Sequence, residues 1–261
     1  MKKIAIIGAG NMGGAIANGL IKGNLILAED ITISDVSDKL LDKFRQISSL
    51  WSLTTSNKSA VKNADIIIVA VKPWLVENVA AEIKNYIDPK KQIIVSIAAG
   101  VDFSQLIEFV GSDVTLFRVI PNTAIEVKES VSTIASLNAD DEQIQFVKSI
   151  FDELGKTFIV DEQYLNAFMS LSSCGIAYAF RYIRAAMEGG VEMGIYPDVA
   201  KEVVVQTLKG AIKLLEENGN HPESEIDKVT TPGGITIKGL NEMEACGFTN
   251  AVIKGLLKSK I

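Results

Sequence analysis

The sequence predicts an α/β fold for its first part and an all-helical arrangement for the rest. Short apolar strands alternate with helical patterns up to Asp161, which is typical of a parallel sheet covered by helices on both faces. A glycine-rich turn joins the first strand to the first helix, and strand patterns disappear after Asp161. We therefore expect a Rossmann-type dinucleotide-binding domain over residues 1–161 and an all-helical domain over residues 162–261.

The composition indicates one large domain or two ordinary ones. The chain has 261 residues, of which 48% are hydrophobic, and a net charge of −6. It has no long run of like charge, so nucleic acid is not an expected partner, although local backbone geometry can still bind an anionic cofactor. Cys174 and Cys246 form neither a metal-binding spacing nor a disulfide framework, which favours a reducing, cytoplasmic compartment. No metal site or membrane span is expected.

The N-terminal glycine turn is the strongest local signal. Lys3–Ile7 is a short apolar strand, and Gly8, Gly10 and Gly13 follow it in a G-x-G-x-x-G pattern that opens a helix. In such a turn the first glycine permits the tight bend, the second lets the backbone approach a pyrophosphate, and the third lets the helix lie close to the strand. The free N–H groups of the helix then favour an anion. The alternative is a glycine turn without a ligand.

Asp35 follows the second predicted strand, Asp30–Ser34. An acid at this position usually accepts hydrogen bonds from the adenosine ribose and disfavours a 2′-phosphate, which would favour NADH. Two alternatives stay open from the residues alone. Ser34, Ser37 and Lys39 could accommodate a phosphate, or Asp35 could simply cap the helix that begins near Ser37.

Further strands alternate with helices and end in small or polar residues. In a parallel sheet, ligands bind outside the carboxyl ends of the strands, so these exits suit a nicotinamide. Each of these segments could be an ordinary loop without a ligand. That alternative explains less well why small or polar residues follow all of the strands. The predicted strands are 64–73, 92–100, 114–123, 129–136 and 156–161, the intervening helices are 76–86, 103–110 and 140–154, and the exits are Lys72-Pro73, Ala98-Ala99-Gly100 and Pro121-Asn122-Thr123.

The second half shows long helical patterns rich in small residues. Ile176, Phe180, Ile183 and Met187 recur at three- and four-residue spacing, and Pro197 marks the start of another helix. The polar segment 217–224 reads as a loop before a closing pair of helices. Apolar residues occur on more than one helix face, and a helical module of this size has a limited interior. We therefore expect a homodimer formed through this half.

The reaction that suits these residues needs little acid–base catalysis. The only histidine, His221, lies in a polar segment, and a histidine there is more often a surface or capping residue than a general base. A protonated cyclic imine is already electrophilic and can take a hydride directly. Hydroxyls and backbone N–H groups are enough to orient it. These groups are available at Thr230, Thr231, Gly233, Gly234 and Thr236.

Several blocks, in order along the whole chain, resemble the pyrroline-5-carboxylate reductase family. The block in the family's signature region is "TPGGITI", residues 231–237. Several independent blocks in the right order make a chance similarity a poor explanation. The others are "GAGNMG" (8–13), the asparagine of "TSNKSAV" (Asn57), "AVKP" (70–73), "VSIAAGV" (95–101), "RVIPNT" (118–123), "AYAF" (177–180), "GGVEMGI" (189–195) and "HPE" (221–223).

The resemblance implies an activity and a set of site residues. NADPH or NADH would donate a hydride to the imine carbon of 1-pyrroline-5-carboxylate to give L-proline, with NADPH the commoner family choice. Members form dimers that often assemble into larger rings, so a dimer or a decamer of dimers is expected. Thr231, Gly233 and Gly234 would hold the substrate carboxylate, and Thr236 the ring nitrogen. The implied cofactor-binding residues are Gly8, Gly10, Asn11, Met12, Gly13, Ser34, Asp35, Asn57, Ala70, Val71, Lys72, Pro73, Ala98, Pro121 and Asn122.

Two stretches depart from the family pattern. After "HPES" the sequence is "EIDKV", residues 225–229, where the family usually has a Leu-Lys pair before the aspartate. The usual "SGSGPAY" is "SSCGIAY" here, so Ser173, Cys174 and Ile176 replace glycine, serine and proline near the family's active site. This departure leaves open a related imine reductase with a different cyclic substrate. A second alternative is a nucleotide-binding regulator without catalysis, against which the intact loop from Thr231 to Thr236 argues.

Overall fold

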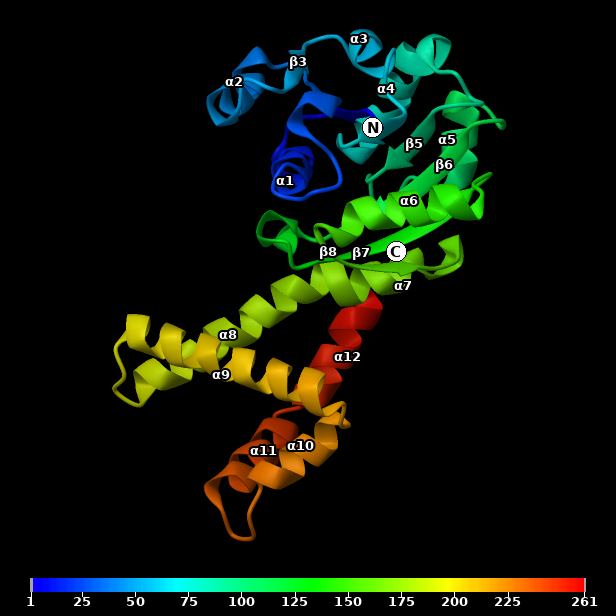
Figure 1. Cartoon of the computed structure of the whole chain (residues 1–261). Coiled ribbons are helices and arrows are strands. Elements are labelled where there is room, and N and C mark those ends of the chain that lie inside the picture. Colours follow the sequence, from blue (N-terminus) through cyan, green and yellow to red (C-terminus); the bar gives the residue numbers. More distant parts are fainter. Residues whose placement is uncertain (1, 261) are drawn as a thin grey trace. The chain divides into compact units, whose positions relative to one another are not determined.

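The structure, a computed structural model, describes residues 2–260, and these fall into two compact units (Figure 1). The first unit ends at Ser173, and the second covers Cys174–Lys260. The first is an α/β unit and the second is all-helical, so the predicted fold class is confirmed. Along residues 2–260, no helix combines the length and the apolar character needed to cross a bilayer.

An eight-stranded sheet forms the centre of the first unit, in the order β3-β2-β1-β4-β5-β6-β7-β8. All neighbouring pairs are parallel except β6 and β7, which are antiparallel. Only a short 3₁₀ segment, Thr123–Val127, connects these two strands, and a parallel crossover needs a much longer connection. The strands are β1 Ile4–Ile7, β2 Ile31–Ser34, β3 Ser52–Thr54, β4 Ile66–Val69, β5 Ile93–Ser96, β6 Thr115–Ile120, β7 Ser130–Leu137 and β8 Gly155–Ile159.

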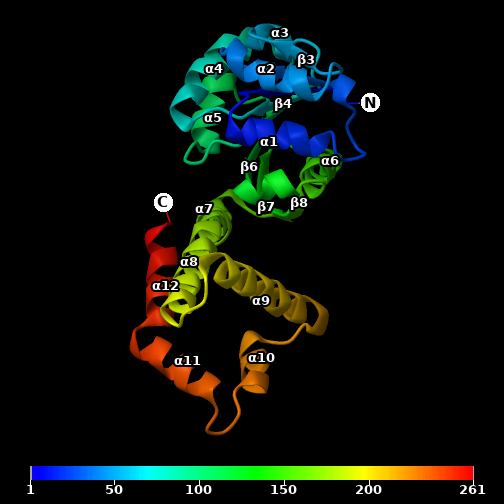
Figure 2. The same ribbon diagram turned by 90° about the vertical axis from the view of Figure 1, so that its left-hand side faces the viewer.

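Helices cover both faces of this sheet, as Figure 2 shows. One face buries apolar residues of α1 Asn11–Leu20, α2 Asp38–Ile47 and α6 Asp141–Asp152. The other face buries those of α3 Asn57–Val61, α4 Val76–Ile83, α5 Phe103–Val110 and α7 Leu165–Met169. Two of the predicted helices begin at capping boxes, Asp102 with Gln105 and Asp140 with Gln143, which satisfy N–H groups of the first turn.

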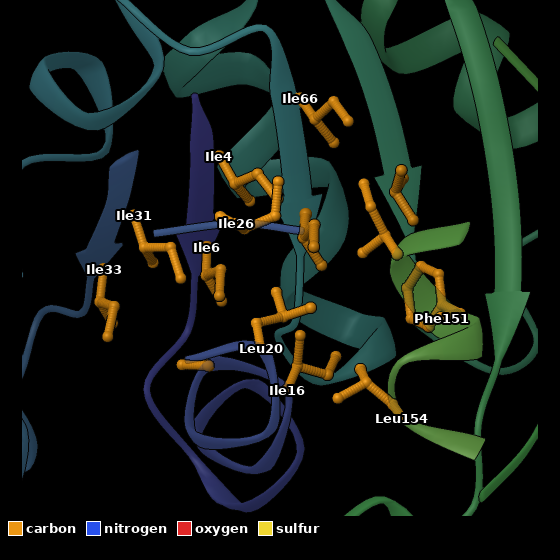
Figure 3. Close-up of a cluster of buried hydrophobic side chains, with 14 of the residues drawn as sticks. Ile4, Ile6, Ile16, Leu20, Ile26, Ile31, Ile33, Ile66, Phe151 and Leu154 are labelled. Carbon is orange, nitrogen blue, oxygen red and sulfur yellow. The ribbon is translucent and has the colours of Figure 1, made fainter. Parts of the chain in front are cut away.

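The first core cluster holds α1 against the centre of the sheet (Figure 3). Ile4 and Ile6 of β1 lie beside Ile16 and Leu20 of α1, and all four are almost fully buried. Burial of each such side chain contributes about 1.5–3 kcal/mol. This packing holds the start of α1 just beyond the carboxyl end of β1.

The first unit extends past β8, because the residues that follow this strand form hydrogen bonds and apolar contacts with the sheet and its helices. Glu162 Oε1 accepts hydrogen bonds from Arg118 Nη1 at 2.6 Å and from the backbone nitrogen of Phe103 at 2.8 Å. Leu165 and Met169 of α7 are buried in the second core cluster. The strand pattern therefore stops at Ile159, whereas the contacts that define the unit continue to Ser173.

The second unit consists of five helices among the described residues. α8 and α9 pack against each other, and Gly190 permits this contact because a Cβ there would lie 3.2 Å from that of Ala200. The predicted loop over residues 217–224 is shorter than expected. Pro222 begins a helix, and His221 Nδ1 accepts a hydrogen bond from the Glu223 nitrogen at its start. The helices are α8 Gly175–Glu192, α9 Pro197–Asn218, α10 Pro222–Val229, α11 Ile235–Ala245 and α12 Phe248–Lys258.

Large apolar side chains of this second unit are exposed in the single chain. The exposed fractions are 61% for Phe180, 78% for Met193 and 81% for Tyr196. A soluble monomer rarely exposes many such side chains in one small module, and they are typical of surfaces that meet another protein.

Candidate functional site

The glycine turn between β1 and α1 has no room for side chains at two of its three glycines. Gly8 has a φ of +106°, and a Cβ there would lie 2.6 Å from the Ala70 oxygen. A Cβ at Gly13 would lie 2.0 Å from the Gly8 oxygen. At Gly10, by contrast, no atom lies within 4 Å of an added Cβ. The first and third glycines therefore allow close backbone packing, and the space beside Gly10 is open.

The N-terminus of α1 is available to an anion. Gly10 is its N-cap residue, and no side chain caps the helix there. Asn11, Met12 and Gly13 are the first helical residues, whose N–H groups have no partner within the helix. Such a terminus, preceded by a glycine turn, is suited to a phosphate group.

A cavity of about 860 Å³ opens at the carboxyl ends of the parallel strands of the first unit. A dinucleotide fits a cavity of this size. Gly13, Pro121 and Asn122 of the predicted cofactor set are not among its lining residues, although Thr123 is. The predicted residues that do line it are Gly8, Gly10, Asn11, Met12, Ser34, Asp35, Asn57, Ala70, Val71, Lys72, Pro73 and Ala98.

Pro121 and Asn122 make contacts within the protein framework instead. The Pro121 oxygen accepts a hydrogen bond from Ser173 Oγ at 3.0 Å. Asn122 Oδ1 accepts from the nitrogen of Ala124 and so caps the 3₁₀ segment that precedes β7. The backbone after β6 is therefore held in place, and Thr123 forms the cavity wall there.

Asp35 connects the glycine turn to the start of α2. Its Oδ2 accepts a hydrogen bond from the Ala9 nitrogen, and its Oδ1 accepts one from the Ser37 nitrogen, both at 2.8 Å. Ser37 is the N-cap residue of α2, so Asp35 does contribute to the start of this helix. Each carboxylate oxygen has a further lone pair. Because Asp35 lines the cavity, a ribose hydroxyl could use these lone pairs.

Three polar side chains beside Asp35 form a hydrogen-bonded chain. Ser34 Oγ donates to Asn57 Oδ1 at 2.7 Å, and Asn57 Nδ2 donates to Glu82 Oε2 at 2.9 Å. All three residues line the cavity. Glu82 lies near the end of α4, and no motif marked it in the sequence. The other lining residues outside the predicted cofactor set are Ile7, Ala15, Val36, Leu40, Leu75, Asn78, Val79, Ile97, Ala99, Thr123, Ile125 and Glu126.

The second predicted site is a turn at the start of α11. The Gly234 nitrogen donates to the Thr231 oxygen at 2.9 Å, and Gly233 has a φ of +71°. With Pro232 before it, this is the pattern of a type II turn. Gly234 is the N-cap residue of α11, and a Cβ on it would lie 2.5 Å from Thr231 Oγ1. The structure thus brings Thr231, Gly233 and Gly234 together in one turn.

The start of α11 has the features of a carboxylate site. No side chain caps this helix, so the N–H groups of its first turn are available to an anion. Thr236 is its second residue and is exposed. The first turn therefore offers a hydroxyl beside backbone donors, which suits a small molecule with a carboxylate next to a nitrogen.

Two family models match the chain. The model described as "Pyrroline-5-carboxylate reductase dimerisation" matches residues 162–260, and the model described as "NADP oxidoreductase coenzyme F420-dependent" matches residues 3–100. The first match includes the turn before α11, and the second includes the glycine turn and Asp35.

Relatives and solved structures agree with these matches. A pyrroline-5-carboxylate reductase of Methanosarcina acetivorans is 37% identical over 99% of this chain and 97% of its own. Pyrroline-5-carboxylate reductase 1 of Dictyostelium discoideum is 36% identical over 98% of this chain, which spans only 48% of that longer relative. The crystal structure of Plasmodium falciparum pyrroline carboxylate reductase with NADP bound has a TM-score of 0.90 at 28% identity, over 99% of this chain and 95% of that one. The chain therefore belongs to the pyrroline-5-carboxylate reductase family.

Proposed function

We propose that the chain reduces the C=N bond of 1-pyrroline-5-carboxylate with NADPH or NADH, which gives L-proline. The observation that carries this proposal is the full-length similarity to the Methanosarcina acetivorans reductase. The glycine turn and the cavity of the first unit fit a dinucleotide, and the Thr-Pro-Gly-Gly turn fits a small carboxylate.

The reaction divides between cofactor chemistry and positioning by the protein. When bound, the reduced nicotinamide supplies the hydride that forms the new C–H bond at the imine carbon. The electron pair of the C=N bond moves to the protonated nitrogen, which becomes the ring amine. The α1 N-terminus would hold the pyrophosphate, and Lys72, Pro73 and Ala98 would lie on the nicotinamide side.

The protein's part toward the substrate is to bind and orient it. The first-turn N–H groups of α11 would bind the carboxylate, with Thr231, Gly233 and Gly234 shaping the turn. The Thr236 hydroxyl would form a hydrogen bond with the ring nitrogen. His221 caps α10 and is not needed as a base. Because the protonated imine is already electrophilic, this arrangement requires no general acid.

A steady-state assay with both cofactors tests the proposal. Oxidation of NADPH or NADH should depend on 1-pyrroline-5-carboxylate, and proline should form in equal amount. Absence of turnover with both cofactors would leave a nucleotide-binding regulator as the better interpretation.

One observation favours a second candidate substrate. Ser173, which replaces the family's glycine, donates to the backbone oxygen of Pro121 after β6. By the family resemblance this contact lies near the active site, so a cyclic imine of another ring size is the alternative substrate. Comparing ring-size variants at saturating cofactor separates the two, and a higher kcat/KM for a larger ring would favour the alternative.

Asp35→Ser should shift cofactor preference toward NADPH by about tenfold, which corresponds to 1.4 kcal/mol. The change removes a negative charge beside the adenosine ribose position. The measurement is kcat/KM for NADPH divided by that for NADH. An unchanged ratio would mean that Asp35 acts only through its hydrogen bonds to Ala9 and Ser37.

The chain should form a homodimer through its second unit. Exposed Phe180, Met193 and Tyr196 and the dimerisation family match support this, and a decamer of dimers is a larger assembly consistent with it. We also propose a cytoplasmic protein that acts on a small molecule without nucleic acid or membrane partners. Sedimentation at micromolar concentration should give at least twice the mass of the single chain, and the single-chain mass throughout a dilution series would contradict the dimer.

A further inference from the structure

Two hydrogen bonds link Ser34, Asn57 and Glu82, and Glu82 determines which group is the donor in each of them. A carboxylate only accepts hydrogen bonds, so the Asn57 amide nitrogen must face Glu82. The Asn57 oxygen then faces Ser34, whose hydroxyl donates to it. Ser34 is fully buried and Asn57 is 5% exposed, so neither can exchange these partners freely with water. Glu82 therefore fixes the orientation of the Asn57 amide in the cavity wall.

The same end of the cavity is acidic. The hydrogen bonds run from Ser34, at the end of β2, to the carboxylate of Glu82 on α4. Asp35, the residue after Ser34, provides a second carboxylate. Asp35 and Glu82 are the acids that line the cavity at this end, whereas Glu126 follows β6. Among the described lining residues, Lys72 is the one with a basic side chain. Lys72 follows β4, which is separated from β2 by β1 in the sheet. A 2′-phosphate is usually bound by an arginine. Lys39, the cation that the sequence offers for it, is exposed on α2 and does not line the cavity, so a 2′-phosphate would meet mainly like charge.

We propose that Glu82 is a specificity-determining residue of the adenosine site. It orients Asn57 and, together with Asp35, disfavours a 2′-phosphate, so that the chain binds NADH more tightly than NADPH. This inference rests on the proposed use of a nicotinamide dinucleotide, but not on which imine is reduced.

Binding of two cofactor fragments to the full-length chain tests this role without any turnover. ADP-ribose and 2′-phospho-ADP-ribose differ only at the position in question, and titration calorimetry gives a Kd for each. The unmodified chain should bind ADP-ribose more tightly. Glu82→Gln keeps the shape of the side chain but removes its charge and lets the Asn57 amide turn over. It should reduce the preference for ADP-ribose at least fivefold.

Matched variants separate this role from a structural one. Glu77→Gln makes the same change on an exposed residue of α4 outside the cavity lining and should leave the preference unchanged. Glu82→Asp keeps the charge and should retain most of the preference for ADP-ribose over 2′-phospho-ADP-ribose. Glu82→Ala should reduce this preference as much as Glu82→Gln does. The same preference in the unmodified chain and in Glu82→Gln would overturn the inference, as would an equal rise of both Kd values. Failure to reduce 1-pyrroline-5-carboxylate would not affect these fragment measurements.

Discussion

Gly13→Ala should strongly weaken dinucleotide binding and also destabilise the first unit. The new Cβ would lie 2.0 Å from the Gly8 oxygen and 3.0 Å from the Ala70 Cβ. Because the first contact is with backbone, the turn or α1 must move, and overpacking of this kind costs about 1–3 kcal/mol. We expect the Kd for NADH to rise about tenfold or more and the Tm to fall by several degrees, measured by calorimetry and thermal unfolding.

Gly10→Ala is the matched control for this prediction. Gly10 has room for a Cβ and an ordinary φ of −70°, so the Tm should stay unchanged. The Kd for NADH should still rise, because the added methyl would stand where the backbone has to approach the pyrophosphate. Unchanged NADH affinity in both variants would contradict the assignment of this turn to the cofactor.

Thr236→Ala should lower kcat by about 10²-fold, the usual effect of losing one positioned hydrogen bond at a reacting centre. Thr236 is the second residue of α11, and its hydroxyl is the proposed partner of the substrate nitrogen. The Kd for NADH should change little, because the glycine turn and the cavity wall are untouched. Steady-state kinetics with cofactor titrations measure both effects.

Thr236→Ser keeps the hydroxyl and should restore most of the activity. This comparison separates the hydrogen bond from the packing of the threonine methyl group. If Thr236→Ala lowers only cofactor affinity, or if the serine variant is as slow as the alanine variant, the role assigned to Thr236 is wrong.

Local sequence patterns were enough to predict most elements of the first unit. The glycine turn, the apolar strands and the helix over residues 103–110 depend on interactions between residues close in sequence, such as the capping box of Asp102 and Gln105. The type II turn before α11 is local in the same way, because Pro232 and Gly233 determine its backbone angles. Family resemblance added the proposed substrate and the significance of Asn57, which spacing alone does not provide.

Tertiary contacts decided the features that the sequence left open. The antiparallel direction of β7 follows from the short connection after β6. The extent of the first unit does not follow from any local pattern: it continues to Ser173 because Glu162 and α7 contact the sheet and its core. One oxygen of Asp35 accepts a hydrogen bond from Ala9, 26 residues away in the chain, whereas the other accepts one from Ser37, two residues further on. Of these two contacts, the one with Ala9 depends on the tertiary structure.

Glu82 shows most clearly why sequence was insufficient for the site. It is 25 residues from Asn57 in the chain, and its place on α4 resembles that of any exposed helical acid. Its contact with Asn57 exists only because the sheet brings β2, α3 and α4 to the same cavity wall. By itself the sequence determined the fold class, the glycine turn and the Thr-Pro-Gly-Gly turn, because backbone geometry and hydrophobic periodicity are local. The contacts of Asp35 with Ala9 and of Asn57 with Ser34 and Glu82 were decided by the tertiary structure, because hydrogen bonds between distant segments leave no periodic pattern.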